Sequence, residues 1–205
     1  MAKNRVHNRL IVGMSGSSGV IYGIRLLEFL NKIPDIETHL IMSSSAKLNI
    51  RLETDWQIKD VEALASQVHD VKDIAANVSS GSFKTLGMVI SPCSIKTLSG
   101  ITNSYSDNLL TRAADVILKE QRKLVLMVRE TPLHPGHCKL LWEASMLGAI
   151  LAPPMPAFYN RPKTLDDIVN HSVGRVLDLF DIDTKLVKRW KGPHTNGHHG
   201  KPTEK

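Results

Sequence analysis

The sequence has few cysteines, few aromatic residues and no long apolar run. Its two cysteines, Cys93 and Cys138, cannot form a disulfide framework and are too far apart for a metal-ligand pair, so we expect a reducing, cytoplasmic location. No run of about 18 apolar residues is present, and the charged N-terminus lacks the apolar segment of a signal peptide, so we expect no membrane association. Aromatic residues make up only 5% and basic residues are scattered, which argues against a nucleic-acid-binding surface.

The composition that remains is that of a globular domain. The 205 residues are 42% hydrophobic and 22% charged, enough to bury one core, and the formal net charge of +6 favours anionic ligands. We expect one domain over residues 1–191. Residues 192–205 are rich in Gly, Pro, His and Lys, and we expect them to form a disordered tail.

A glycine-rich stretch at residues 13–19 follows the apolar run 10–12 and precedes helical periodicity over residues 20–32. This order predicts a strand, a tight turn and a helix whose N-terminus attracts an anion, usually phosphate. Gly13, Gly16 and Gly19 are spaced three apart, which matches neither the dinucleotide fingerprint nor a Walker A loop. An ordinary strand-to-helix turn is therefore an equally good interpretation of this stretch alone.

Strands and helices alternate along the chain. Short apolar runs predict strands at residues 10–12, 38–42, 88–90 and 124–128. Periodic segments predict helices at residues 20–32, 46–52, 60–65, 108–120 and 140–147, and a last helix beginning at Thr164 with a buried stripe from Leu165 to Phe180. Residues 153–162 contain four prolines and are predicted to form neither helix nor inner strand. The alternation predicts a doubly wound, Rossmann-like α/β fold with a mostly parallel sheet.

Small hydroxyl residues follow three of the predicted strands. The first leads to residues 15–19, the second to residues 43–45 and the third, through a predicted loop, to residues 91–94, while Arg129-Glu130 follows the fourth. Ligands of such sheets bind beyond the carboxyl ends of the strands. The pattern therefore predicts a site for a phosphorylated ligand the size of a flavin or a nucleotide.

Seven motifs, in their order along residues 9–191, resemble the UbiX-like flavin prenyltransferase family. They are Gly16-Ser17-Ser18-Gly19, Glu53-Thr54, Ser79-Ser80-Gly81-Ser82, Pro92-Cys93-Ser94, residues 108–120, Arg129-Glu130-Thr131-Pro132 and Pro156-Ala157-Phe158-Tyr159. The proline-rich stretch 153–162 is similar to members that accompany hydroxyarylic (phenolic) acid decarboxylases as their B subunit.

The resemblance implies a metal-independent activity. Family members join the dimethylallyl group of dimethylallyl phosphate to N5 and C6 of reduced FMN, releasing phosphate, and the prenylated FMN serves a UbiD-type decarboxylase. The family assembles as a dodecamer with sites shared between subunits. The sequence leaves open whether the prenyl donor is the mono- or the diphosphate and which acid the partner decarboxylates.

The resemblance also assigns roles to residues of this chain. Ser18, Glu53 and Glu130 match the family's active-site serine and acidic residues. The implied FMN-binding residues are Gly16, Ser17, Ser18, Ser43, Ser94, Ile95, Lys96, Thr97 and Arg129. The implied ligands of the prenyl phosphate are Arg112, Lys119, Tyr159 and Arg175. Cys93 receives no chemical role.

Several of these assignments have structural alternatives. Arg112 and Lys119 lie on one helix face with Asp115 between them, which is also the pattern of a solvated ion-pair stripe. Arg175 is three residues from Asp178, and Glu53 also fits a surface acid at a helix end.

Two other functions stay open. One is an FMN-dependent cysteine decarboxylase of related fold, whose Pro-Ala-Ser-Ala-Asn-Thr motif is not recognisable here. The other is a non-catalytic FMN-binding subunit of a phenolic acid decarboxylase.

Overall fold

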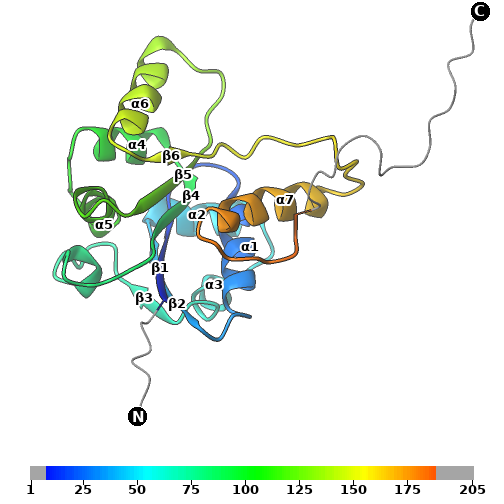
Figure 1. Cartoon of the computed structure of the whole chain (residues 1–205), viewed down its shortest axis with the longest axis horizontal. Helices are drawn as coiled ribbons and strands as arrows, with labels where there is room; N and C mark the ends of the chain where they lie inside the picture. Colours follow the sequence, from blue (N-terminus) through cyan, green and yellow to red (C-terminus); the bar gives the residue numbers. More distant parts are fainter. Residues whose placement is uncertain (1–7, 188–205) are drawn as a thin grey trace, which may run out of the picture.

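The computed structural model describes residues 8–187 and shows a sheet covered by helices on both faces (Figure 1). The strands are β1 (Asn8–Met14), β2 (Ile36–Met42), β3 (Gln67–His69), β4 (Gly87–Cys93), β5 (Lys123–Val128) and β6 (Ile150–Leu151). The α-helices are α1 (Val20–Leu30), α2 (Ser44–Glu53), α3 (Ile58–Glu62), α4 (Ile95–Thr102), α5 (Leu109–Lys119), α6 (Pro135–Met146) and α7 (Leu165–Asp178). A 3-10 turn, η1, spans Asn77–Ser79.

The six strands form one parallel sheet in the order β3-β2-β1-β4-β5-β6. The chain moves outward from β1 to β3, then returns to the other side of β1 and moves outward again through β4 to β6. The order therefore reverses between β1 and β4, where an open α/β sheet binds its ligand. The predicted doubly wound fold is confirmed.

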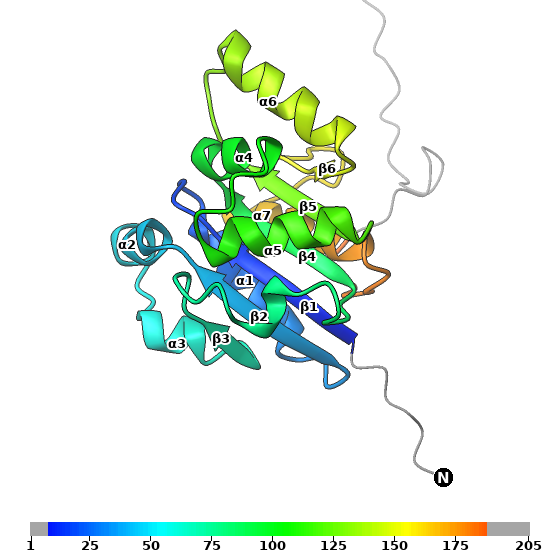
Figure 2. The ribbon, with the colours of Figure 1, turned by 90° about the vertical axis from the view of Figure 1, so that its left-hand side faces the viewer.

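Alternating side chains of each strand feed two hydrophobic cores. Leu10 and Val12 of β1 pack with residues of α1 and α7, whereas Ile11, between them, packs with residues of α4 and α5. Figure 2 shows α5 in front of the sheet and α1 and α7 behind it. Both faces of the sheet are thus buried, which explains why its strands appear in the sequence as short continuous apolar runs.

The predicted strands and helices are all present, and the structure adds elements that the sequence pattern did not indicate. These are β3, β6, α4 and η1. Residues 91–94 were predicted to be a loop, but β4 continues through Pro92 to Cys93, and all of its residues are buried. The stripe of α7 begins one turn later than predicted, because Leu165 is 82% exposed while Val169 and Val173 are buried.

Thr164 caps α7 with a full capping box, as its sequence predicts: its side chain accepts from the Asp167 N–H, and Asp167 accepts from the Thr164 N–H. Residues 153–162 form neither helix nor strand, as predicted, and run from β6 to α7 (Figure 1). The predicted tail, residues 192–205, lies outside the described residues. None of the helices within residues 8–187 is long and apolar enough to span a membrane.

Candidate active site

A cavity of about 750 Å³ opens where the loops after β1, β2 and β4 meet the start of α5. Five of the residues predicted to bind FMN line it: Gly16, Ser43, Ser94, Lys96 and Thr97. They come from three separate segments, which the parallel sheet brings to one edge. The structure therefore brings together most of the predicted flavin site in one chain.

Three helices begin at this cavity, each with its N-cap residue in the cavity wall. The Ser43 Oγ accepts from the Ala46 N–H of α2 at 3.1 Å, the Ser94 Oγ from the Thr97 N–H of α4 at 3.3 Å, and the Asn108 Oδ1 from the Thr111 N–H of α5 at 3.1 Å. A helix N-terminus carries partial positive charge and N–H groups that have no partner inside the helix. Three such ends and the Lys96 side chain suit a ligand with a phosphate group.

The cavity wall is held by hydrogen bonds between the loops after β1 and β4. The Ser15 hydroxyl donates to the Pro92 carbonyl at 3.0 Å and accepts from the Ser94 N–H at 2.7 Å. Next to it, a Cβ on Gly16 would lie only 2.3 Å from the Cβ of Ser45. The first and second loops approach so closely that residue 16 has room for glycine alone.

The N-terminus of α1 is occupied by a carboxylate of the chain itself. Glu53, the last residue of α2, accepts hydrogen bonds from the Gly19 N–H at 2.8 Å and the Val20 N–H at 3.3 Å. In the described chain, Glu53 thus supplies the anion that the glycine-rich stretch predicts at the start of α1. Binding of a phosphate there stays a prediction. The helix ends that line the cavity are those of α2, α4 and α5.

Arg129 and Glu130 follow β5 at the same edge of the sheet. The Arg129 N–H donates to the Cys93 carbonyl at 3.1 Å, and the Glu130 carboxylate accepts from the Thr131 N–H at 3.0 Å. Both side chains are exposed in the single chain. Cys93 is fully buried, and burial raises the pKa of its thiol to about 12, so it stays protonated and cannot serve as a nucleophile at neutral pH.

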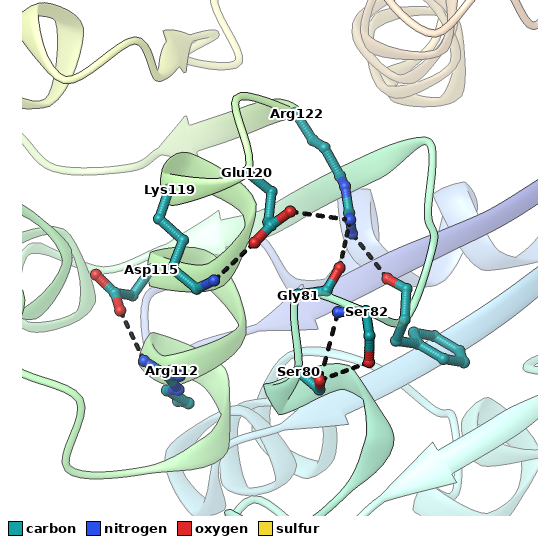
Figure 3. A network of polar contacts seen from close by, with 9 residues as sticks. Ser80, Gly81, Ser82, Arg112, Asp115, Lys119, Glu120 and Arg122 are labelled. Atoms are coloured by element: carbon teal, nitrogen blue, oxygen red, sulfur yellow. Dashed lines mark hydrogen bonds and ion pairs between the residues drawn. The ribbon is translucent and has the colours of Figure 1, made fainter.

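Arg112 and Lys119 lie on α5, outside the cavity wall, and each has an acidic partner (Figure 3). Arg112 pairs with Asp115 at 2.9 Å, and Lys119 pairs with Glu120 at 2.7 Å. The ion pair considered as the structural alternative for Arg112 is therefore present. All four side chains are at least partly exposed, so the pairs contribute little to stability and leave both cations accessible to an anionic ligand.

The loop at residues 80–83 approaches Lys119 and is fixed from the opposite side by Arg122 (Figure 3). The Arg122 guanidinium donates to the Gly81 carbonyl at 2.6 Å and to the Phe83 carbonyl at 2.7 Å, and Glu120 lies 3.6 Å from it. A Cβ on Gly81 would collide with Glu120 and would lie 2.9 Å from the Lys119 Nζ. Arg122 and Glu120 thus hold the loop and the ammonium group side by side.

Replacing Arg122 with alanine should loosen this loop. The side chain is only 12% exposed, so the substitution leaves two carbonyls without a charged donor, and we expect the free energy of unfolding to fall by about 2 kcal/mol or more. Hydrogen exchange followed by mass spectrometry should show faster exchange at residues 80–83. Lys123→Ala is the matched control, because Lys123 donates to the Leu179 carbonyl instead; equal exchange in the two variants would contradict the role of Arg122.

Tyr159 and Arg175 lie at α7, on the opposite face of the sheet from α5. The Tyr159 hydroxyl is 2.9 Å from the Nε2 of His171, which is buried one helical turn before Arg175. Arg175 pairs with Asp178 at 2.9 Å, which is the ion pair considered as its alternative. The sequence analysis did not single out His171, because it is two residues from both Val169 and Val173 and so lies outside the predicted apolar stripe.

The described chain therefore separates the predicted residues into groups. Glu130 and the residues predicted to bind FMN lie at the carboxyl edge of the sheet, Arg112 and Lys119 on one face, and Tyr159 and Arg175 on the other. Within residues 8–187, no three His, Cys, Asp or Glu side chains are placed to hold a metal ion.

Comparison with known proteins identifies the family of the chain. The family model described as Flavoprotein matches residues 2–170. The flavin prenyltransferase UbiX of Escherichia coli K12 is 61% identical over 186 residues, which are 90% of this chain and 98% of that protein. The crystal structure of AnUbiX in complex with FMN and dimethylallyl pyrophosphate has a TM-score of 0.89 and 47% identity, covering 91% of this chain and 98% of the other.

Two further structures bear on assembly and on the alternative function. A dodecameric FMN-dependent UbiX-like decarboxylase from Escherichia coli O157:H7 has a TM-score of 0.88 and 52% identity, covering 90% of this chain and all of the other. The peptidyl-cysteine decarboxylase EpiD covers 86% of this chain with a TM-score of 0.62, but at 20% identity it shows a shared fold alone. The chain belongs to the flavoprotein family and, within it, to the UbiX-like flavin prenyltransferases.

Proposed function

We propose that this protein is a flavin prenyltransferase that transfers the dimethylallyl group of dimethylallyl phosphate to reduced FMN. The observation that carries the proposal is the 61% identity to a UbiX flavin prenyltransferase over 90% of the chain. The cavity supports it, because its hydroxyl-rich wall and three helix N-termini fit a ligand that has a phosphate and many hydrogen-bonding groups.

The chain's residues supply binding and charge neutralisation. FMN, when bound and reduced, supplies the N5 and C6 atoms that accept the prenyl group. Gly16, Ser17 and Ser18 hold the flavin together with Ser43, the segment Ser94–Thr97 and Arg129. In this proposal, which follows the family's motifs, Ser18 contacts the flavin near N5, and Glu53 and Glu130 move protons as phosphate leaves and the new ring closes.

The four remaining predicted residues bind the prenyl phosphate. An alkyl phosphate is a poor leaving group until its negative charge is neutralised, and Arg112, Lys119, Tyr159 and Arg175 provide three cations and a hydroxyl for this purpose. They lie on opposite faces of one chain. We therefore infer that each site is completed by neighbouring copies in a homo-oligomer, in line with the dodecameric relative.

We further propose that the product, prenylated FMN, serves a UbiD-type decarboxylase acting on a hydroxyarylic acid. The ground is the likeness of residues 153–162 to members that accompany such enzymes. A cytoplasmic location is inferred from the two free cysteines, Cys93 and Cys138.

The direct test is anaerobic incubation of the purified protein with FMN, a reductant and dimethylallyl monophosphate, followed by mass spectrometry of the extracted flavin. We expect the flavin to gain one C5 unit. Glu130→Gln and Tyr159→Phe should each reduce the rate by about a hundredfold, the usual scale for a residue that assists proton transfer or charge stabilisation. A parallel incubation with the diphosphate identifies the preferred donor.

Unmodified FMN, recovered from protein shown to bind both ligands, would contradict the proposal. The non-catalytic FMN-binding subunit would then be the better account of the same cavity.

A further inference from the structure

Tyr159 is joined to a buried histidine that the sequence motifs do not include. Its hydroxyl oxygen lies 2.9 Å from the Nε2 of His171, and the two rings meet edge to face, with centroids 5.7 Å apart and planes at 79°. Tyr159 comes from the proline-rich segment before α7 and is 51% exposed, whereas His171 is within α7 and 7% exposed. An exposed side chain on an irregular segment is thus held by a rigid helix.

His171 is buried, although it lies on a different side of α7 from the apolar stripe. It is two residues from both Val169 and Val173, which belong to the core between α7 and the sheet, whereas His171 lies beside residues 150–155. A polar ring in such a place is unfavourable unless it forms a hydrogen bond, and the phenol of Tyr159 provides one. Burial, reinforced by the charge of Arg175 and opposed by that of Asp178, lowers the pKa of His171, so the ring is neutral at neutral pH.

His171 and Arg175 lie on the same side of α7 and line the same cavity. They are four residues apart on α7, which places them on the same side of the helix, and both line a cavity of about 280 Å³ beside residues 150–155. The histidine therefore connects Tyr159 to the part of α7 that carries the arginine. Both Tyr159 and Arg175 belong to the phosphate-binding set proposed above.

We propose that His171 is a positioning residue that orients the hydroxyl of Tyr159 toward the phosphate of the prenyl donor bound at Arg175. A neutral imidazole has one N–H, and placing it on Nε2 lets His171 donate to the phenolic oxygen. The proton of the phenol then points away from the histidine, toward an anionic oxygen. This inference rests on the proposed function, because it acts only through Tyr159.

Two substitutions separate the hydrogen bond from the packing. His171→Leu keeps an apolar volume in the core but removes the donor. His171→Gln keeps an N–H near the position of Nε2. We expect His171→Leu to lower kcat/KM for the prenyl donor about tenfold or more, the scale of one hydrogen bond to a reacting group, while His171→Gln stays within about threefold of the wild type. FMN binding, measured by flavin fluorescence, should be unchanged in both.

A double-mutant cycle with Tyr159→Phe tests whether His171 acts through the phenol. In the Tyr159→Phe background, His171→Leu should cause no further loss, because the hydroxyl that it orients is already absent. Equal losses in the two backgrounds, or wild-type activity of His171→Leu beside an impaired Tyr159→Phe, would overturn the role of His171. An absence of prenylation by the wild type would overturn the proposed function itself and this inference with it.

Discussion

Mixed oligomers of two inactive variants should recover prenyltransferase activity. We expect Lys119→Ala and Glu130→Gln each to lose nearly all activity alone, because one removes a phosphate-binding cation and the other a proton-transfer group. When the two variants are co-expressed and assembled together, we expect about a quarter of the wild-type activity per site. In a site built from two chains, the chain that supplies Lys119 carries it intact in about half of random assemblies, and the chain that supplies Glu130 does so independently in about half.

The geometry of α5 is the reason for this expectation. The helix begins at the cavity, where Asn108 caps it, and ends at Lys119, four residues before β5 begins. Ten residues of helix separate Leu109 from Lys119, which is about 15 Å. Lys119 thus lies near the amino edge of the sheet, whereas Glu130 follows β5 at the carboxyl edge. A donor bound at Lys119 of one chain cannot react with a flavin in the cavity of the same chain.

The matched control is a mixture of Lys119→Ala with Arg112→Ala. Both residues lie on α5, so every site of that mixture would contain a damaged α5, and we expect no recovery. The activity of each mixture is measured by the C5 mass gain of the flavin. Failure of the first mixture to exceed either variant alone would mean that Lys119 and Glu130 act from the same chain.

The sequence was sufficient for those parts of the fold that rest on local patterns. Apolar runs located the four central strands, and Thr164 with Asp167 marked the start of α7. It did not locate β3 and β6, because strands of three and two residues have no periodicity to detect. It also placed a loop at Pro92, since proline usually interrupts an inner strand, although here β4 continues past it with a register shift before Cys93.

In the candidate site, too, some features were predictable from local sequence patterns and others were not. The serines at the strand ends were predictable, because parallel strands bring their carboxyl ends to one edge. The capping of α1 by Glu53 and the contact of Tyr159 with His171 join residues 34 and 12 positions apart through the packing of helices. No local pattern predicts such a pair, so the sequence could indicate Glu53 and Tyr159 only through the family's motifs.

Acid should lower the stability of the protein through a pair of buried histidines, His39 and His69. His39 of β2 is fully buried, and its Nδ1 lies 2.9 Å from the Nε2 of His69 in β3, with the two rings stacked. Burial lowers the pKa of His39 to about 4, although Glu37, 3.2 Å from its Nε2, acts in the opposite direction. Burial lowers the pKa of His69 as well, with Asp73 opposing it.

Stability should therefore fall as the pH drops from about 6.5 toward 4. In that interval the unfolded chain binds a proton at His39 and the folded chain does not, so protons favour unfolding; the lowered pKa of His69 acts in the same direction. For His39 alone, the interval between a pKa of about 6.5 in the unfolded state and about 4 in the folded state corresponds to a loss of about 3 kcal/mol. Below pH 4 the folded chain binds the proton too, and this contribution stops growing.

Urea denaturation between pH 7 and pH 4, at one protein concentration, measures this loss. His39→Asn keeps a hydrogen-bonding partner for His69 but does not titrate, so its stability should depend less on pH. His134→Asn is the control for replacing a histidine with asparagine, since His134 is exposed and asparagine also caps a helix, and its stability at pH 7 should stay close to that of the wild type. A wild-type stability that is level or rises from pH 6.5 to 4 would contradict the expectation.

The same acid effect should reach the loop at residues 80–83, beside Lys119, before the protein unfolds. The ring of Phe83 meets His39 edge to face at 5.0 Å, and the Arg9 guanidinium lies 4.5 Å above that ring. Phe83 is also the residue whose carbonyl accepts from Arg122. A positive charge on His39 would disturb the packing of the Phe83 ring, while Arg122 would still hold the Phe83 carbonyl. Protection factors at residues 80–83, which correct for the slower intrinsic exchange at lower pH, should therefore fall at pH values where the protein is still folded, and should fall less in His39→Asn.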